Sequence, residues 1–408
     1  MFGRKHSYYE KFQYWKAYEI MSLSTARVLG IGLILATIAL LFIAGCGQPA
    51  KKSDSPIASN SPSFVAQDGS TSIRVTPVGA EYAGNEACSP CHALVFKDHK
   101  NSGHNLTMHF LDKEGMGDTA PPTGKIAASS YAVEKDESKF YFSSTTHPEA
   151  EGVLNVSMGS GNTGITYLDL EPDFLAEAQM SYFPKLKKWY VTPGHQSNPG
   201  PNLGTVYKGE TAQKCVFCHS TKMEADTLIP ERKFIGVGCE ACHGPGSLHI
   251  TAMKAGKFSE GKMLKLESVG AGRVLQVCQQ CHKPKPGSTM NTSRQTLVGL
   301  LKSECYLQGK DTLSCISCHN PHTNVSRDVK AYEKVCLNCH SSVATPVFKA
   351  GVTVQGKICP VNAKDQCIKC HMPPGAAFEN TSTPTKFADH FIRVHKEKIP
   401  QSHATKIL

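Results

Sequence analysis

The chain has 408 residues, among them 17 cysteines and 18 histidines, and a formal net charge of +10. So many cysteines exclude an ordinary cytosolic enzyme, in which such residues are sparse and reduced. Charged residues make up only 19% and aromatic residues 8%, while 34 glycines and 24 prolines indicate many turns. A large apolar core is therefore not expected, and core-poor domains compensate with disulfides, metals or cofactors.

The N-terminal residues predict an export signal. Residues 28–44 are continuously apolar and lie between Arg27 and Gly45. This run is short for a membrane-spanning helix and ends in small residues, as cleaved signal peptides do. We therefore expect a signal peptide over residues 1–45, with a retained membrane helix as the alternative.

The residues that follow predict a lipid anchor. Residues 43–46, Ile-Ala-Gly-Cys, resemble the bacterial lipobox, in which the cysteine thiol receives a diacylglyceryl group. We expect Cys46 to be lipidated and residues 46–80, rich in serine, proline and lysine, to form a flexible tether. Gly47 stands where an aspartate would favour retention in the inner membrane, so the expected location is the outer membrane, at its periplasmic or cell-surface face.

A motif for covalent heme attachment, Cys-x-x-Cys-His, occurs seven times. Two thiols three positions apart can reach the two vinyl groups of one heme, and the histidine that follows lies beneath the iron as its proximal ligand. A bare Cys-x-x-Cys could be a zinc or redox motif, but every copy here is followed by histidine. The sequence therefore predicts seven covalent hemes c. The motifs are Cys88-Cys91-His92, Cys215-Cys218-His219, Cys239-Cys242-His243, Cys278-Cys281-His282, Cys315-Cys318-His319, Cys336-Cys339-His340 and Cys367-Cys370-His371.

Heme attachment also changes the net charge that is expected for the protein. Each heme carries two propionate carboxylates, so seven hemes would offset the positive charge of the chain. We expect the basic side chains to neutralise propionates, since net charge governs association and solubility. No nucleic-acid partner is therefore predicted.

The spacing of the motifs predicts two heme domains. About 120 residues separate the first motif from the second, whereas the other six lie within residues 215–371. In the long segment, KFYFSSTT, GVLNVSMG and GITYLDL alternate apolar and polar residues, which indicates strands. We expect a mainly α, loop-rich fold with a heme-stacked core and a small β insertion at about 138–192. The expected domains are residues 81–260 with hemes 1–3 and residues 261–408 with hemes 4–7.

The histidines outside the motifs are candidates for the sixth, distal iron ligand. His322 lies only three residues after a proximal histidine, so it would reach the iron of a neighbouring heme. Local context favours four candidates, His104, His249, His322 and His390, followed by His195 and His395. The other candidates are His99, His109, His147 and His403, with Met108 and Met372 as alternatives to histidine.

Two further cysteines, Cys305 and Cys359, belong to no motif. In an oxidising compartment such an even pair suggests a disulfide. Two buried free thiols are the alternative.

The first four motifs resemble a known family. The motif CSPCH followed by His104 and Met108, and the string GVGCEACHGPG at residues 236–246, are similar to the tetraheme cytochrome c that accepts electrons from hydroxylamine oxidoreductase. The resemblance follows that family's motif order over residues 88–282. It implies a mostly helical fold with closely stacked heme pairs and a distal role for His104. One heme of that family has an open axial site, whose counterpart here is the motif that ends at His219.

The last third of the chain resembles a wider group of multiheme cytochromes. The strings ECYLQGKDTLSCISCHNPH, CIKCHMPP and FADHFIR are typical of that group. The resemblance implies that His322 and His390 are iron ligands. The chain departs from the tetraheme family by three additional hemes and by a longer first insertion, which contains His147 and His195.

These features predict an electron carrier rather than an enzyme. A heme with two histidine ligands has no vacancy for a substrate and exchanges electrons only. We expect electrons to pass along the hemes to or from a redox protein or an extracellular acceptor. The alternative is a multiheme reductase that acts on nitrite, hydroxylamine or a sulfur oxyanion at one open heme.

Overall fold

The computed structural model describes residues 78–395 apart from gaps at 148, 196–202, 284–295, 310–311, 342–344, 347–352, 363 and 377–384. Val65–Leu408 forms one compact unit, and the predicted domain boundary near residue 260 stays a prediction. The expected signal peptide, Cys46, most of the tether and His403 lie outside the described residues. Within the described part, no helix is long and apolar enough to cross a membrane.

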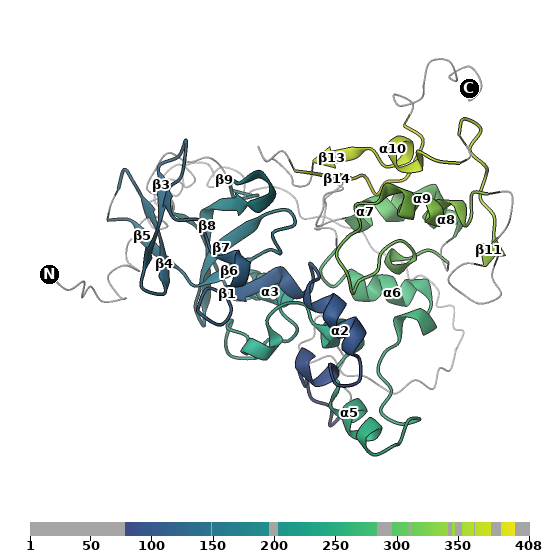
Figure 1. Cartoon of the computed structure of the whole chain (residues 1–408), viewed down its shortest axis with the longest axis horizontal. Helices are drawn as coiled ribbons and strands as arrows, with labels where there is room; N and C mark the ends of the chain where they lie inside the picture. Colours follow the sequence, from purple (N-terminus) through teal and green to yellow (C-terminus); the bar gives the residue numbers. More distant parts are fainter. Residues whose placement is uncertain are drawn as a thin grey trace, which may run out of the picture. The chain divides into compact units, whose positions relative to one another are not determined.

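The strand-rich part follows the first motif and contains two antiparallel sheets (Figure 1). The larger sheet has the strand order β1-β6-β7-β8-β10, and β9 also pairs with β8. The smaller sheet has the order β2-β3-β4-β5, and its β5 packs against β7. The strands are Met108–Phe110 (β1), Gly124–Lys125 (β2), Tyr131–Asp136 (β3), Lys139–Ser144 (β4), Glu151–Leu154 (β5), Val156–Met158 (β6), Ile165–Leu170 (β7), Phe174–Phe183 (β8), Lys188–Val191 (β9) and Gly204–Lys208 (β10).

Alternating burial explains why these segments form strands. In β4, Phe140 and Phe142 are buried while the residues between them are more exposed, so one face of the strand is apolar. Gly204 opens β10 with a φ of 145°, and a Cβ there would overlap the carbonyl of Glu177 on β8. Only glycine allows that close approach of two strands.

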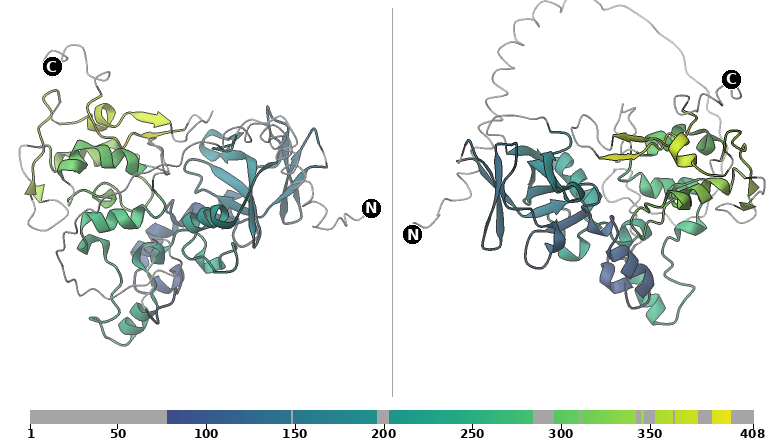
Figure 2. Two further views of the ribbon diagram at one scale, coloured as in Figure 1. Left: turned by 180° about the vertical axis from the view of Figure 1, so that it is seen from behind. Right: turned by 45° about the horizontal axis from the view of Figure 1, so that its top comes forward.

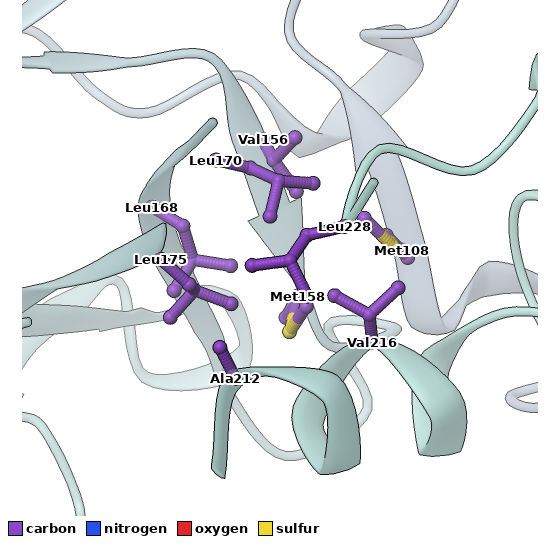
Figure 3. Close-up of a cluster of buried hydrophobic side chains, with 9 residues drawn as sticks. All are labelled: Met108, Val156, Met158, Leu168, Leu170, Leu175, Ala212, Val216 and Leu228. Carbon is purple, nitrogen blue, oxygen red and sulfur yellow. The ribbon is translucent and has the colours of Figure 1, made fainter. Parts of the chain in front are cut away.

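One face of the larger sheet is covered by α3, Gly209–His219 (Figure 3). Ala212 and Val216, one helical turn apart, are fully buried and belong to one apolar cluster with Leu168 and Leu175 of the sheet. Residues four apart lie on the same side of a helix, so Ala212 and Val216 together determine which side of α3 faces the strands. The second heme motif, which occupies the end of α3, is thereby fixed to the sheet.

The other motifs lie in a part of the chain built of short helices and loops (Figure 2). In both views the long strands belong to the blue and teal residues, and short helices dominate the green ones. The remaining α-helices are Ala93–Lys100 (α2), Cys239–His243 (α4), Ser247–Lys254 (α5), Ala271–Cys278 (α6), Thr296–Lys302 (α7), Glu304–Gln308 (α8), Val329–Leu337 (α9) and Cys367–His371 (α10). The 3₁₀ turns Asn85–Cys88 (η1) and Cys315–Ser317 (η7) carry motif residues, and two small ladders pair Thr345–Pro346 (β11) with Thr353–Val354 (β12) and Pro374–Ala376 (β13) with Lys386–Ala388 (β14).

The expectation of a mainly α fold with a small β insertion is wrong. Of the described residues, 32% are helical and 21% are in strands. The strands expected within residues 139–169 are confirmed, but β1, β2, β3 and β10 lie outside the expected insertion at about 138–192, and the sheets span residues 108–208. The segments β1 and β10 were not expected from the sequence, and they pair with β6 and β8 respectively.

Candidate heme-attachment motifs and axial histidines

Each of the seven motifs folds as one helical turn. In four of them the backbone N–H of the motif histidine donates to the carbonyl of the first cysteine at 2.9–3.0 Å, as His92 does to Cys88. The other three, at 215–219, 239–243 and 367–371, lie within α3, α4 and α10. A helical turn places positions i, i+3 and i+4 on one side, so both thiols and the imidazole face the same way.

Backbone carbonyls orient the motif imidazoles. In four motifs the ring Nδ1 lies 2.6–3.0 Å from a carbonyl oxygen, in the pairs His219 with Thr107, His243 with Leu264, His340 with Lys357 and His371 with Arg393. A carbonyl oxygen can only accept, so Nδ1 donates the proton and Nε2 keeps its lone pair. This is the arrangement of metal-binding histidines, whose outer hydrogen bond fixes the tautomer and the ring orientation.

Four motif histidines face a second histidine from another part of the chain. The ring centres are 6.1–6.3 Å apart in the pairs His92 with His249, His243 with His322, His282 with His104 and His319 with His390. The second members of these pairs are the four candidates that local context favours. The ring planes differ by 11–30° in three pairs and by 71° in the pair of His282 and His104.

This separation fits one iron between two rings. An imidazole nitrogen binds a transition metal at about 2 Å, and the ring centre lies about 1 Å beyond it, so rings on opposite sides of one iron have centres about 6 Å apart. Three of the second histidines also have Nδ1 at 2.9–3.2 Å from a carbonyl oxygen. These carbonyls belong to Pro321 for His104, Gly261 for His249 and Ala388 for His390. The residues present therefore fit heme c with two axial histidines.

The two lower-ranked candidates have other described contacts. The Nε2 of His195 lies 3.0 Å from Oε2 of Glu177, and its Nδ1 lies 3.2 Å from Oε1 of Gln179, so both ring nitrogens are engaged. His395 is 5% exposed, and its Nε2 lies 3.9 Å from Oδ2 of Asp389. The structure brings neither of them into a described pair with a motif histidine.

His99 is a buried histidine that sequence context left unranked. It is 7% exposed, and its ring centre lies 6.3 Å from that of His322. Desolvation, followed by the neighbouring His104 and His322, lowers the pKa of His99 to about 4. Its imidazole is therefore neutral near pH 7. Met108, an alternative axial ligand, is fully buried in the apolar cluster beneath α3.

Six of the seven motifs pack in pairs. The turn η1 packs against α4, α6 packs against η7, and α9 packs against α10. In each pair a thiol of one motif contacts a thiol of the other, namely Cys88 with Cys239, Cys278 with Cys315 and Cys336 with Cys367. These thiols stand for the thioether sulfurs of the heme-loaded protein. The second motif differs, because α3 packs against β8 and β10.

Sequence reasoning missed the residues that hold the histidines in place. Gly356 lies against the ring of His340, where a Cβ would be 2.5 Å from Cε1 and 2.6 Å from Nδ1. Glu240, between the cysteines of the third motif, is 1% exposed. Only Glu240 leaves a signal in the sequence, since a carboxylate inside an attachment turn must be either exposed or paired.

The two remaining cysteines are not joined in the structure. Burial raises the pKa of Cys305, whose thiol lies near that of Cys339. The sulfur of Cys359 accepts a hydrogen bond from the backbone N–H of Asn362 at 3.5 Å. The expected disulfide between Cys305 and Cys359 stays a prediction.

Comparisons with known proteins agree with the motifs. The family described as "Cytochrome c554 and c-prime" matches residues 183–244, and the family described as "Doubled CXXCH motif" matches residues 308–345. The findings support a multiheme c-type cytochrome. Multiheme cytochrome MtrA of Shewanella baltica is similar to this chain, at 22% identity over 206 residues, which are 47% of the chain and 55% of that protein. The chain thus spans about half the length of this curated relative.

Two solved structures are also similar to this chain. The outer cell wall cytochrome OcwA is 16% identical, with 76% of this chain and 79% of that chain covered and a TM-score of 0.41. The undecaheme cytochrome from the S-layer of Carboxydothermus ferrireducens is 17% identical, with 79% and 54% covered and a TM-score of 0.35.

Proposed function

We propose that the chain is a seven-heme electron-transfer cytochrome in which at least four irons have two histidine ligands. The observation that carries this proposal is the set of four histidine pairs with ring centres 6.1–6.3 Å apart. When bound, heme c supplies one-electron exchange between ferrous and ferric iron. Two imidazoles on one iron leave no position for a substrate, so these four sites would serve electron exchange.

Residues 319–324 contribute to three of the four pairs. His319 and His322 each face a histidine of another segment. Between them, the carbonyl of Pro321 lies 3.1 Å from Nδ1 of His104 and orients that ring toward its own partner. One short segment therefore controls the axial geometry of three irons, which couples their ligand environments.

Asn324 fixes this segment to two other parts of the chain. Its Nδ2 donates to the carbonyl of Asn101 at 2.8 Å, and its Oδ1 accepts from Nδ2 of Asn162 at 2.9 Å. Asn101 follows α2 and Asn162 lies in the turn after β6. These two bonds connect the segment that contains His319 and His322 to the residue after α2 and to the turn after β6.

The paired motifs support closely spaced electron exchange. Attachment turns that touch through their thiols bring two cofactor sites together, the first with the third and the fourth with the fifth. The three motif histidines outside the described pairs are His219, His340 and His371. For their distal ligands we retain His395, which is buried, and His195, which would have to leave Glu177.

The N-terminal residues support an exported and lipid-anchored protein. We propose that Cys46 carries the lipid and that residues 46–80 let the heme-bearing unit meet a redox protein or an extracellular acceptor at the outer membrane. Cys46→Ser should abolish the incorporation of a labelled fatty acid into the protein while leaving its heme content unchanged. Incorporation of the label into this variant would contradict the anchor at Cys46.

Heme quantification together with low-temperature EPR of the ferric protein tests the function. The pyridine hemochrome assay should give seven hemes per chain, and the four pairs should give low-spin signals. Nearly perpendicular imidazole planes make two iron d orbitals nearly degenerate, so the pair at 71° should give a signal with a large gmax, and the other three should be rhombic. A high-spin heme that shifts on addition of nitrite or hydroxylamine would instead favour the reductase.

One variant links the spectrum to the structure. His104→Ala should abolish the large-gmax signal and leave the three rhombic ones, because only His104 is removed from its pair with His282. His147→Ala is the matched control, since His147 bonds to its neighbour Thr146 and belongs to no described pair. An unchanged large-gmax signal in His104→Ala would contradict the assignment.

A further inference from the structure

Glu240 is a buried carboxylate whose hydrogen bonds leave its own motif. It lies between the two cysteines of the third motif and is 1% exposed. Its Oε1 accepts from the backbone N–H of Ala83 at 2.8 Å and of Gly246 at 2.7 Å, and its Oε2 accepts from that of Gly84 at 2.8 Å. A charge so deeply buried is tolerated only where hydrogen bonds replace its hydration.

Two of these donors precede the first motif. Ala83 and Gly84 lead directly into η1, whose last residue is Cys88. Asn85, the next residue, accepts with Oδ1 from the backbone N–H of Cys239 at 2.9 Å. The carboxylate of Glu240 therefore holds the start of the first attachment turn against the third.

The third donor precedes the helix that supplies a distal histidine. Gly246 is followed by α5, which carries His249. Ser247 and Glu81 add two reciprocal bonds to the same junction, from Glu81 N–H to the Ser247 hydroxyl at 2.8 Å and from Ser247 N–H to the Glu81 carbonyl at 3.2 Å. The start of α5 is thus fixed to the residues before the first motif.

These contacts converge on one histidine pair. His92 follows η1, His249 lies in α5, and their ring centres are 6.3 Å apart with planes 24° from parallel. The histidine of Glu240's own motif, His243, is oriented instead by the carbonyl of Leu264. Glu240 therefore fixes the two segments that bring His92 and His249 together.

We infer that Glu240 is a positioning residue for the first heme, although it belongs to the attachment motif of the third. Its carboxylate sets the distance between the turn that carries His92 and the helix that carries His249. This inference rests on the proposed function, because it requires that both histidines bind one iron.

A glutamine at position 240 keeps the size of the side chain, but it cannot accept hydrogen bonds with both of its terminal atoms. Its carbonyl oxygen can still accept, but its amide nitrogen is a donor and would face a backbone N–H that also donates. At least one of the three backbone groups then loses its acceptor while it stays buried, which favours movement of that segment. Since the donors precede η1 and α5, the movement separates His249 from His92.

The test compares Glu240→Gln with Glu86→Gln in the heme-loaded protein. Glu86 is exposed and lies within η1, so its replacement is a matched control for the first motif. Glu240→Gln should keep the wild-type heme content, lose one rhombic low-spin EPR signal and gain high-spin intensity of one heme per chain. Added imidazole should restore the low-spin signal, because it can occupy the position that His249 leaves.

Two outcomes would overturn the inference. Glu240→Gln with the same EPR spectrum as Glu86→Gln would show that the carboxylate does not position the first heme. High-spin intensity that imidazole does not convert would indicate general damage instead.

If Glu240→Gln yields no folded protein, the variant Ser247→Ala tests the same junction. In Ser247→Ala, imidazole should bind to one heme at concentrations that leave the wild-type spectrum unchanged. The same response to imidazole in Ser247→Ala and in wild type would overturn the inference. A wild-type protein without bis-histidine signals would instead contradict the proposed function itself.

Discussion

The residues of the two large sheets and the residues that carry the motifs are held together in different ways. The sheets bury a core of their own side chains, in which Val133, Tyr167 and Phe183 are at most 1% exposed. The short helices of the motif part have smaller described clusters, such as Leu266 with Val274 and Val277. Their order depends on carbonyl bonds to imidazoles and on contacts between motifs. We therefore expect the sheets to fold from side-chain burial alone and the motif part to need its hemes.

Removal of all hemes should give the largest effect. In a chain produced without heme attachment, backbone amides of β4, β7 and β8 should stay protected from hydrogen exchange, because apolar side chains of the strands form most of their core. Amides of α4 to α10 should lose most of their protection, since the described side-chain clusters of this part are small. Hydrogen exchange followed by mass spectrometry measures both regions at once. Equal loss of protection in both would show that the sheets also depend on heme.

Truncation in the sheet core should cost less and stay local. Phe140 is 2% exposed, and Phe140→Ala should lower the free energy of unfolding of the sheet part by about 3–5 kcal/mol. Phe258 is 75% exposed, and Phe258→Ala should change it by less than about 0.5 kcal/mol. Denaturation followed by far-UV circular dichroism gives these values, and the EPR signals of the native variants should match wild type. A changed ligation pattern in Phe140→Ala would mean that the two parts are not independent.

A single methyl group in the motif part should disturb ligation more than stability. Gly356→Ala places a Cβ against the ring of His340, and such overpacking costs about 1–3 kcal/mol. The ring must tilt, so the sixth motif should change its EPR signal while the heme content stays the same. Gly272→Ala is the control, because nothing lies within 4 Å of its added Cβ. An unaltered spectrum for Gly356→Ala would mean that the segment, and not the ring, moves.

The smallest effect concerns pH and belongs to the sheet part. Burial, reinforced by Glu171, raises the pKa of Asp169 to about 7 from its ordinary 3.8. A carboxyl whose pKa is higher in the folded than in the unfolded state stabilises the fold while it is protonated. This stabilisation is complete below the pKa of the unfolded state and is lost as the pH rises through the pKa of the folded state. The free energy of unfolding should therefore fall as the pH rises from about 4 to about 7, and Asp169→Asn should remove this slope. Urea titrations at several pH values measure it, and identical slopes in both proteins would contradict the assignment.

The sequence predicted local features far better than those that depend on distant contacts. The seven motifs and the strands near Phe140 follow from short patterns, and the structure has them where the patterns lie. The four favoured histidines lie opposite motif histidines, although ligation itself stays a proposal. The extent of the sheets was not predictable, because β1 and β10 are defined by their partners. The role of Glu240 was hidden for the same reason, since its donors lie more than 150 residues away in the sequence for Gly84 and Ala83.

The crossed pairing of histidines also orders events in time during synthesis. A chain made from its N-terminus presents His92 long before His249, and His243 before His322, whereas His104 already exists when His282 emerges. Of these four motifs, the fourth is the one whose partner histidine, His104, precedes it in the chain. Under the proposed ligation, the first motif gains its second histidine only after the third motif is complete, and the fifth gains His390 near the end of the described chain. A truncated chain that ends before His249 would therefore contain a first attachment site without its proposed second histidine.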